Sequence, residues 1–315
     1  MSSAVRPSLA DMFAAVLTTL CWSLAAQFSQ RSIQVLGVVQ ANLGRLIVAV
    51  ILLGACAHVF GLGMGGAGRD AFLWSGVIGM GLGDLALFAA LPRLGTRLTI
   101  LICQCVAVPI AMVTEWGWLD TRLTLTQIGW AAVILVGVTI ALMPSAKSPP
   151  KVPITRIGIA LGLGAAIGQG IGAVISRRAY EITTEAGMSI DGITAAYQRI
   201  SGGLAITVGY FLYIWWRDRQ RARAGRATSG QIHRYTWKGF GYLSANAMFG
   251  PVLGVSCYQW ALATTPSGIV LPIVATTPLV IIPFAYWFDG DIPTRRSLMG
   301  GFVAVAGVIA LTLVR

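Results

Sequence analysis

Two arginines and one aspartate lie deep inside otherwise apolar stretches, where charge is costly and therefore marks a functional site. Arg45, in QANLGRLIVAV, follows Asn42 by one helical turn, and Arg199 follows Tyr197 in AAYQRISG. A guanidinium can hold a carboxylate or phosphate through two parallel hydrogen bonds. Asn42, Arg45, Tyr197 and Arg199 are therefore candidate substrate-binding residues. The alternative for each arginine is an internal ion pair that fixes a helix crossing.

Asp84, in GLGDLALF, is the only acidic residue that the sequence places in the interior of an apolar run. A carboxylate at such a depth can bind and release a proton, so Asp84 is a candidate proton-coupling residue. Two other interpretations remain open: a structural salt bridge to Arg45 or Arg199, or a span boundary in the wrong place.

Uncharged polar side chains at similar depth could line a path across the membrane. Gln104, Asn246 and Gln259 are candidate substrate-binding residues of this kind. The alternative for each is a hydrogen bond between helices. The chain has two histidines, and its five cysteines lie in apolar runs without the spacing of a disulfide framework or a zinc site. The sequence therefore predicts no metal, no cofactor and no histidine-based enzyme.

The composition is that of an integral membrane protein. The chain has 315 residues, of which 56% are hydrophobic and 11% charged, and its mean hydropathy is +0.75. The apolar runs are continuous rather than alternating, which excludes a β-barrel. Ten runs are long enough to cross a bilayer of about 30 Å. They lie near 9–28, 37–59, 72–91, 95–115, 127–145, 157–176, 190–214, 239–262, 266–288 and 297–314.

The two halves of the chain resemble each other. GDLALFAAL at 83–91 aligns with GVSCYQWAL at 254–262, and Pro109 in AVPIAM aligns with Pro278 in TTPLVI. The sequence therefore predicts two five-helix repeats, residues 1–146 and 147–315. Because five is odd, consecutive copies enter the membrane from opposite sides, which predicts an all-α protein with ten transmembrane helices in two inverted repeats. Pro109 and Pro278 then kink equivalent helices and are candidate hinges; a static kink is the alternative.

These features resemble the EamA-like family of the drug/metabolite transporter superfamily. The matching features, in order, are Arg45, AL at 90–91, Gly95, Pro109, Asp120, Gly129 and Gly137, then Arg199, AL at 261–262, Pro278, Asp291, Gly300 and Gly307. The family usually has Glu where this chain has Asp120 and Asp291, and Pro266 stands here in the place of Gly95. The resemblance implies a carrier of small metabolites such as amino acids, often moved outward, by exchange or with protons.

The basic residues bear on partners and orientation. The segment 217–238 holds seven Lys or Arg between two apolar runs, which favours contact with anionic lipid headgroups over nucleic acid. The distribution of Lys and Arg over the connections puts both termini outside, whereas the family resemblance implies cytoplasmic termini. The sequence predicts no oligomeric state.

Together these features predict a multi-pass protein of the cytoplasmic membrane that exports or exchanges small metabolites by alternating access. A flippase for a lipid-linked metabolite is the nearest alternative, and it would need a cavity open sideways to the bilayer. A membrane-embedded enzyme is the more distant alternative, because one interior aspartate and two histidines supply no acid-base constellation.

Overall fold

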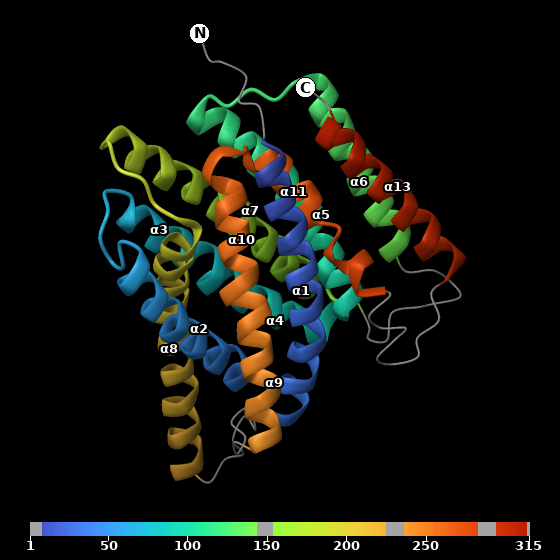
Figure 1. The fold of residues 1–315 in the computed structure, drawn as a ribbon. Helices are drawn as coiled ribbons and strands as arrows, with labels where there is room; N and C mark the ends of the chain where they lie inside the picture. Colours follow the sequence, from blue (N-terminus) through green and yellow to red (C-terminus); the bar gives the residue numbers. More distant parts are fainter. Residues whose placement is uncertain (1–7, 144–153, 225–235, 283–293, 314–315) are drawn as a thin grey trace.

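The computed structural model describes residues 8–143, 154–224, 236–282 and 294–313, and these are helical apart from short connections (Figure 1). In the first half the elements are α1 (Leu9–Leu36), α2 (Val38–Phe60), α3 (Arg69–Gly76), η1 (Val77–Leu82), α4 (Gly83–Leu94), α5 (Thr96–Leu119) and α6 (Leu125–Leu142). In the second half they are α7 (Arg156–Glu185), α8 (Gly192–Arg223), α9 (Trp237–Ala247), η2 (Met248–Gly254), α10 (Val255–Thr264), α11 (Ser267–Val274) and α13 (Arg295–Leu313).

Polar caps set where several helices begin. Side-chain oxygens of Ser8, Thr124, Thr155, Asp191 and Thr236 accept backbone N–H groups from the first turns of α1, α6, α7, α8 and α9. The helices can therefore begin at the edge of an apolar layer without leaving unpaired donors in it.

Two of the helices contain a wide π-helical turn. α3, η1 and α4 form one continuous helix, and so do α9, η2 and α10. The segments η1 and η2 begin at Val77 and Met248, which are 171 residues apart. The same offset relates GDLALFAAL to GVSCYQWAL. The π-helical turns thus occupy equivalent places in the two halves, and π-helical turns are frequent at functional sites.

Seven helices among the described residues are long and apolar enough to cross a membrane. They are α1, α2, the α3–α4 helix, α5, α6, α7 and α13. The expected total of ten includes α8, the α9–α10 helix and the short α11, none of which meets this standard. α8 and the α9–α10 helix carry polar residues such as Arg199 and Asn246 in their apolar stretches, so their crossing stays a prediction.

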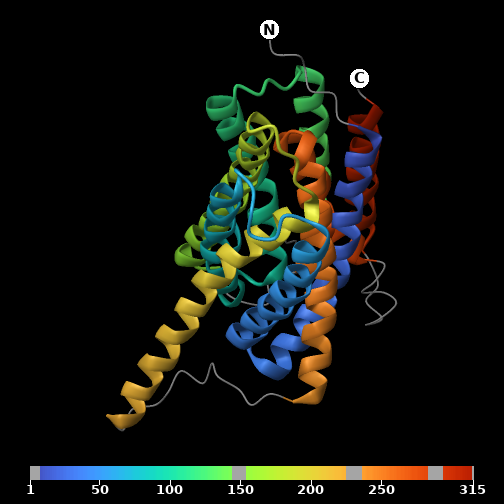
Figure 2. The ribbon, with the colours of Figure 1, turned by 60° about the vertical axis from the view of Figure 1, so that its left-hand side comes forward.

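The halves pack through reciprocal contacts. α1 lies against α9, α10 and α11 of the second half, while α7 lies against α3, α4 and α5 of the first. α2 packs against α8, and α6 packs along α13 (Figure 1). α1 begins and α13 ends at the same end of the bundle, and α8 projects beyond its neighbours at the opposite end (Figure 2).

Small residues allow α7 to approach the α3–α4 helix closely. A Cβ on Gly168 would lie 2.8 Å from the Cα of Gly83, and one on Gly172 would lie 3.0 Å from the Cα of Gly79. Larger side chains would separate the two halves here.

The two candidate hinge prolines differ in their surroundings. Pro109 lies inside the continuous helix α5, whereas Pro278 follows a break at 275–276 and opens a short helical turn. Hydroxyl groups satisfy the carbonyls near this break: the Thr277 hydroxyl donates to the Val274 carbonyl over 2.6 Å, and the Ser23 hydroxyl of α1 donates to the Thr277 carbonyl over 2.9 Å. Neighbouring side chains thus provide the hydrogen bonds that lipid cannot supply.

The contact between α6 and α13 gives a stability prediction. A Cβ on Gly137 would lie 2.5 Å from the backbone nitrogen of Ala304 and 2.7 Å from the carbonyl oxygen of Gly300, whereas one on Gly129 would meet nothing within 4 Å. We expect Gly137→Ala to destabilise the protein by about 1–3 kcal/mol through overpacking. Gly129→Ala, the matched control, is expected to be neutral or stabilising by up to about 1 kcal/mol. Thermal unfolding in detergent checks this, and equal melting temperatures for the two variants would contradict it.

Candidate functional site

Arg45 and Asp84 form an ion pair between α2 and α4. The distance from Arg45 Nη2 to Asp84 Oδ2 is 2.7 Å, and Arg45 Nε donates to Asn42 Oδ1 over 2.8 Å. The Phe88 ring lies 5.8 Å from the guanidinium carbon. The side chains of Arg45 and Asp84 are 16% and 20% exposed, so the pair is mostly but not fully buried. Of the interpretations of Asp84, the salt bridge to Arg45 is the arrangement seen here.

Asn246 approaches the same place from the α9–α10 helix. A Cβ on Gly250 of η2 would lie 3.3 Å from Asn246 Oδ1 and 4.0 Å from Arg45 Nη1. The Nδ2 of Asn246 is buried and makes no hydrogen bond. A glycine at 250 therefore leaves room beside the arginine, next to an amide donor that lacks an acceptor.

Arg199 lies at the centre of a second polar cluster, which joins four helices. Its Nη1 donates to Ser176 Oγ over 2.8 Å and to the Gly172 carbonyl over 3.2 Å. Ser176 Oγ also accepts from Gln259 Nε2 over 3.1 Å and lies 2.8 Å from Ser75 Oγ. Arg199 is 4% exposed, and among the described residues no carboxylate lies within salt-bridge distance of it. The cluster thus stabilises a buried cation through neutral groups.

Both arginines reach the α3–α4 helix, which carries Asp84. Arg199 Nη2 points to η1, where a Cβ on Gly79 would lie 2.8 Å from it, and Asp84 follows η1 directly on the same helix. Two guanidinium groups therefore lie near the η1–α4 part of this helix, which carries a single carboxylate, and this leaves a local excess of positive charge. Such a place attracts an anionic group.

Three buried polar atoms that make no hydrogen bond lie in the same region. Gln259 Oε1 and the Tyr258 hydroxyl are buried and lack a hydrogen-bond partner, as does Asn246 Nδ2. The Tyr258 ring lies 5.5 Å from the guanidinium carbon of Arg199. Buried polar groups are normally paired, so a polar ligand at the two clusters would find donors and acceptors ready.

Two expected substrate-binding residues lie outside these clusters. Gln104 accepts from Gln169 Nε2 over 2.7 Å, which joins α5 to α7, as the helix-contact alternative for such residues predicts. Tyr197 faces α2, where its ring lies 5.3 Å from that of His58 in an edge-to-face arrangement. Positions two apart on a helix point in nearly opposite directions, so Tyr197 does not face the same side as Arg199.

A buried ion pair that sequence reasoning missed joins α5 to α7. Glu115 Oε1 lies 3.2 Å from Arg177 Nε, and the two side chains are 3% and 8% exposed. Asp84 is therefore not the only acid that the protein buries. Glu115 closes an apolar run and precedes tryptophans typical of a membrane interface, so the sequence places it at the bilayer edge.

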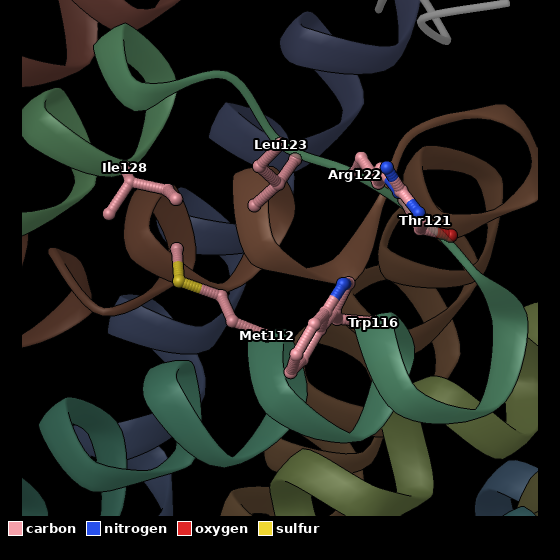
Figure 3. A pocket seen from close by; sticks show the side chains of 6 residues that line it. All are labelled: Met112, Trp116, Thr121, Arg122, Leu123 and Ile128. Atoms are coloured by element: carbon pink, nitrogen blue, oxygen red, sulfur yellow. The ribbon is translucent and has the colours of Figure 1, made fainter. Parts of the chain in front are cut away.

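A pocket of about 410 Å³ lies between the end of α5 and the connection to α6 (Figure 3). It is lined by Met112, Trp116, Thr121, Arg122, Leu123 and Ile128. Leu123 and Met112 also pack against Gly268 of α11. The pocket lies apart from the arginine clusters, toward one end of the bundle.

The remaining expectations lie partly outside the described residues. α8 continues to Arg223, so the first part of the basic segment 217–238 is helical, while residues 225–235 lie outside the described ranges, as does Asp291. No group of three or more His, Cys, Asp or Glu in the described part of the chain could hold a metal ion.

Comparison with known proteins points to one family. The EamA-like transporter family model matches twice, over residues 9–143 and 156–313. A solved structure titled "Crystal structure of protein" superposes with a TM-score of 0.67 and 16% sequence identity, over 96% of this chain and 95% of that chain. At this identity it shows the shared fold alone. No curated protein matches the chain.

Proposed function

Because the chain belongs to the EamA-like transporter family, a family of membrane transporters for small molecules, we propose that it is a secondary transporter of small metabolites such as amino acids. It exports or exchanges them across the cytoplasmic membrane by alternating access. The observation that carries the proposal is the pair of arginine clusters: Arg45 bonds Asp84 directly, and Arg199 is held by neutral groups. Charges held at such a depth mark substrate and ion paths.

The geometry supports a substrate with a carboxylate. A carboxylate group would take the place of Asp84 on Arg45, whose second partner Asn42 holds the guanidinium in place. Once Asp84 is released from Arg45, its carboxylate accepts a proton, or it accepts a hydrogen bond from the ammonium group of the substrate. Asn246 and Gln259 supply further hydrogen bonds, since each has one buried polar atom without a partner. Gln104 and Tyr197 act through helix contacts, not through the substrate.

Reciprocal packing supports two inverted repeats that rock against each other. The contacts of α1 with the third and fourth helices of the second half have a counterpart in those of α7 with the first half. In this proposal residues 1–146 and 147–315 form the two repeats, all ten helices cross the membrane, and Pro109 and Pro278 act as hinges. The arginines of the 217–238 segment then lie at the level of anionic headgroups.

Uptake into liposomes tests the proposal. Purified protein is reconstituted, and uptake of radiolabelled amino acids and small carboxylates is measured with and without a pH gradient. We expect saturable uptake of at least one compound above that of protein-free liposomes. Folded protein that moves none of them, while it transfers a fluorescent lipid between leaflets, would overturn the metabolite proposal in favour of the flippase.

A further inference from the structure

A second set of buried charges joins the helices at the end of the bundle where α1 begins and α13 ends. Besides its ion pair with Arg177, Glu115 accepts the backbone N–H of Ser267, the first residue of α11, over 2.8 Å, and it accepts the Ser267 hydroxyl as well. Arg177 Nη1 donates to the carbonyls of Leu262 and Ala263, over 2.9 and 3.1 Å, where α10 ends. The pair thus bonds both sides of the α10–α11 connection.

Asp11 ties α1 to the same connection. Its Oδ2 accepts the hydroxyls of Thr264 and Thr265 at the end of α10, and Asp11 is 5% exposed. We call this set the charged lock. It consists of Asp11 and Glu115 from the first half and Arg177, Thr264, Thr265 and Ser267 from the second. Its bonds therefore cross between the two halves that rocking would separate.

A charged contact suits a joint that opens. Burying two charges costs a large desolvation free energy. Packed apolar side chains stabilise a permanent contact between helices as well as a buried ion pair does, or better. When the halves separate, water solvates both ions and compensates for the lost ion pair. An apolar joint has no such compensation, because opening exposes its whole surface to water.

The repeat relates the lock to positions at the opposite end. SQRS at 29–32 aligns with SRRA at 176–179 at an offset of 147, and the caps Ser8 and Thr155 are separated by the same offset. Gln30 therefore corresponds to Arg177, and Gly158 to Asp11.

Glu115 has no acidic counterpart either. With the offsets of 169 to 171 that relate the two copies of the fourth helix, Glu115 aligns with Phe284, Ala285 or Tyr286. None of the three charges has a charged residue at its aligned position, so the repeat does not reproduce these three charges in the other copy.

We propose that the charged lock is the gate at this end of the transport path, formed when the path is closed here and broken when it opens. Asp11, Glu115 and Arg177 are positioning residues that set how often this end opens. The inference rests on the proposed alternating access and adds the residues that bias it.

Distances between spin labels test the gate without any substrate. Trp118, at the end of α5, is 54% exposed, and Ala186, which follows α7, is exposed. Both positions lie at the end of the bundle that holds the charged lock. Both are replaced by cysteine in a protein whose five native cysteines are removed, and the distance is measured by double electron–electron resonance. Closed protein gives a short distance, and opening at this end gives a longer one.

The expected result is a change in populations. Glu115→Gln and Arg177→Gln each raise the ratio of long to short distances by about tenfold or more, because each leaves a buried charge without its partner. The double variant raises the ratio less than either single variant. The control is Arg178→Gln, which removes the exposed ion pairs to Glu181 and Glu185 one position along α7 and leaves the ratio unchanged.

Two outcomes would overturn the gate and are distinguishable. If the unsubstituted background shows both distances and the lock variants leave their ratio at the control value, alternating access stands and the lock is only structural. If every variant keeps one short distance while the melting temperature falls, the lock stabilises a static joint, and alternating access fails with it.

Discussion

Replacing Arg45 by alanine is expected to lower saturable uptake into liposomes about a hundredfold, the size of effect that follows removal of a charged hydrogen-bond partner. Among the described residues, Arg45 is the one cation that bonds Asp84 directly, and its side chain is 16% exposed. Arg45→Lys is expected to fall between the wild type and the alanine variant, because an ammonium group cannot reproduce the planar fork that bonds Asn42 and Asp84 together.

The controls separate binding from folding. Arg178→Ala removes an arginine from the surface of α7 and should keep full uptake. Arg45→Ala leaves Asp84 without its partner, so the double variant Arg45→Ala with Asp84→Asn is examined as well. We expect it to regain stability and to stay inactive. Uptake by Arg45→Ala within twofold of the wild type would remove Arg45 from the substrate site.

Neutralising Asp84 is expected to abolish the response of transport to a pH gradient. Asparagine keeps the size of the side chain, and its Oδ1 can still accept from Arg45, but it cannot take up a proton. Accumulation driven by the gradient should therefore fall to the level measured without one. Exchange of labelled for unlabelled substrate, which needs no net proton movement, should persist.

Accumulation and exchange are measured in the same liposomes, so exchange that persists in Asp84→Asn shows that the variant is folded. Gradient-driven accumulation that is unchanged in Asp84→Asn would limit Asp84 to its salt bridge with Arg45. Loss of exchange together with accumulation would instead make Asp84 a substrate ligand without a coupling role.

Sequence patterns predicted the arginine clusters because charge inside an apolar run is unmistakable. Arg45, Asp84 and Arg199 each lie within a long, mostly apolar run, so the sequence alone singled them out as candidates. Their partners could not. Ser176 joins Arg199 to Gln259, but serine is common in transmembrane helices, and only the folded arrangement of α7, α8 and α10 reveals this contact.

The ends of the helices were harder to interpret than their middles. Glu115 lies four residues before the end of α5 and Arg177 eight residues before the end of α7, where acidic and basic residues ordinarily meet lipid headgroups or water. Their burial depends on α10 and α11 meeting beside them, which no local pattern encodes. Tyr197 shows the opposite error: it is close to Arg199 in sequence, yet the helix turns it toward His58.

The wide turns η1 and η2 also record the history of the chain. A π-helical turn arises when one extra residue is accommodated in an α-helix without breaking it. The family match covers the chain twice, and both copies carry the wide turn at the same offset of 171 residues. The simplest order of events is that the insertion was already present in a five-helix ancestor and that gene duplication then copied it. Asp84 follows η1, whereas the aligned residue after η2 is Val255. The two copies therefore keep the same wide turn but differ in the charge of the residue that follows it.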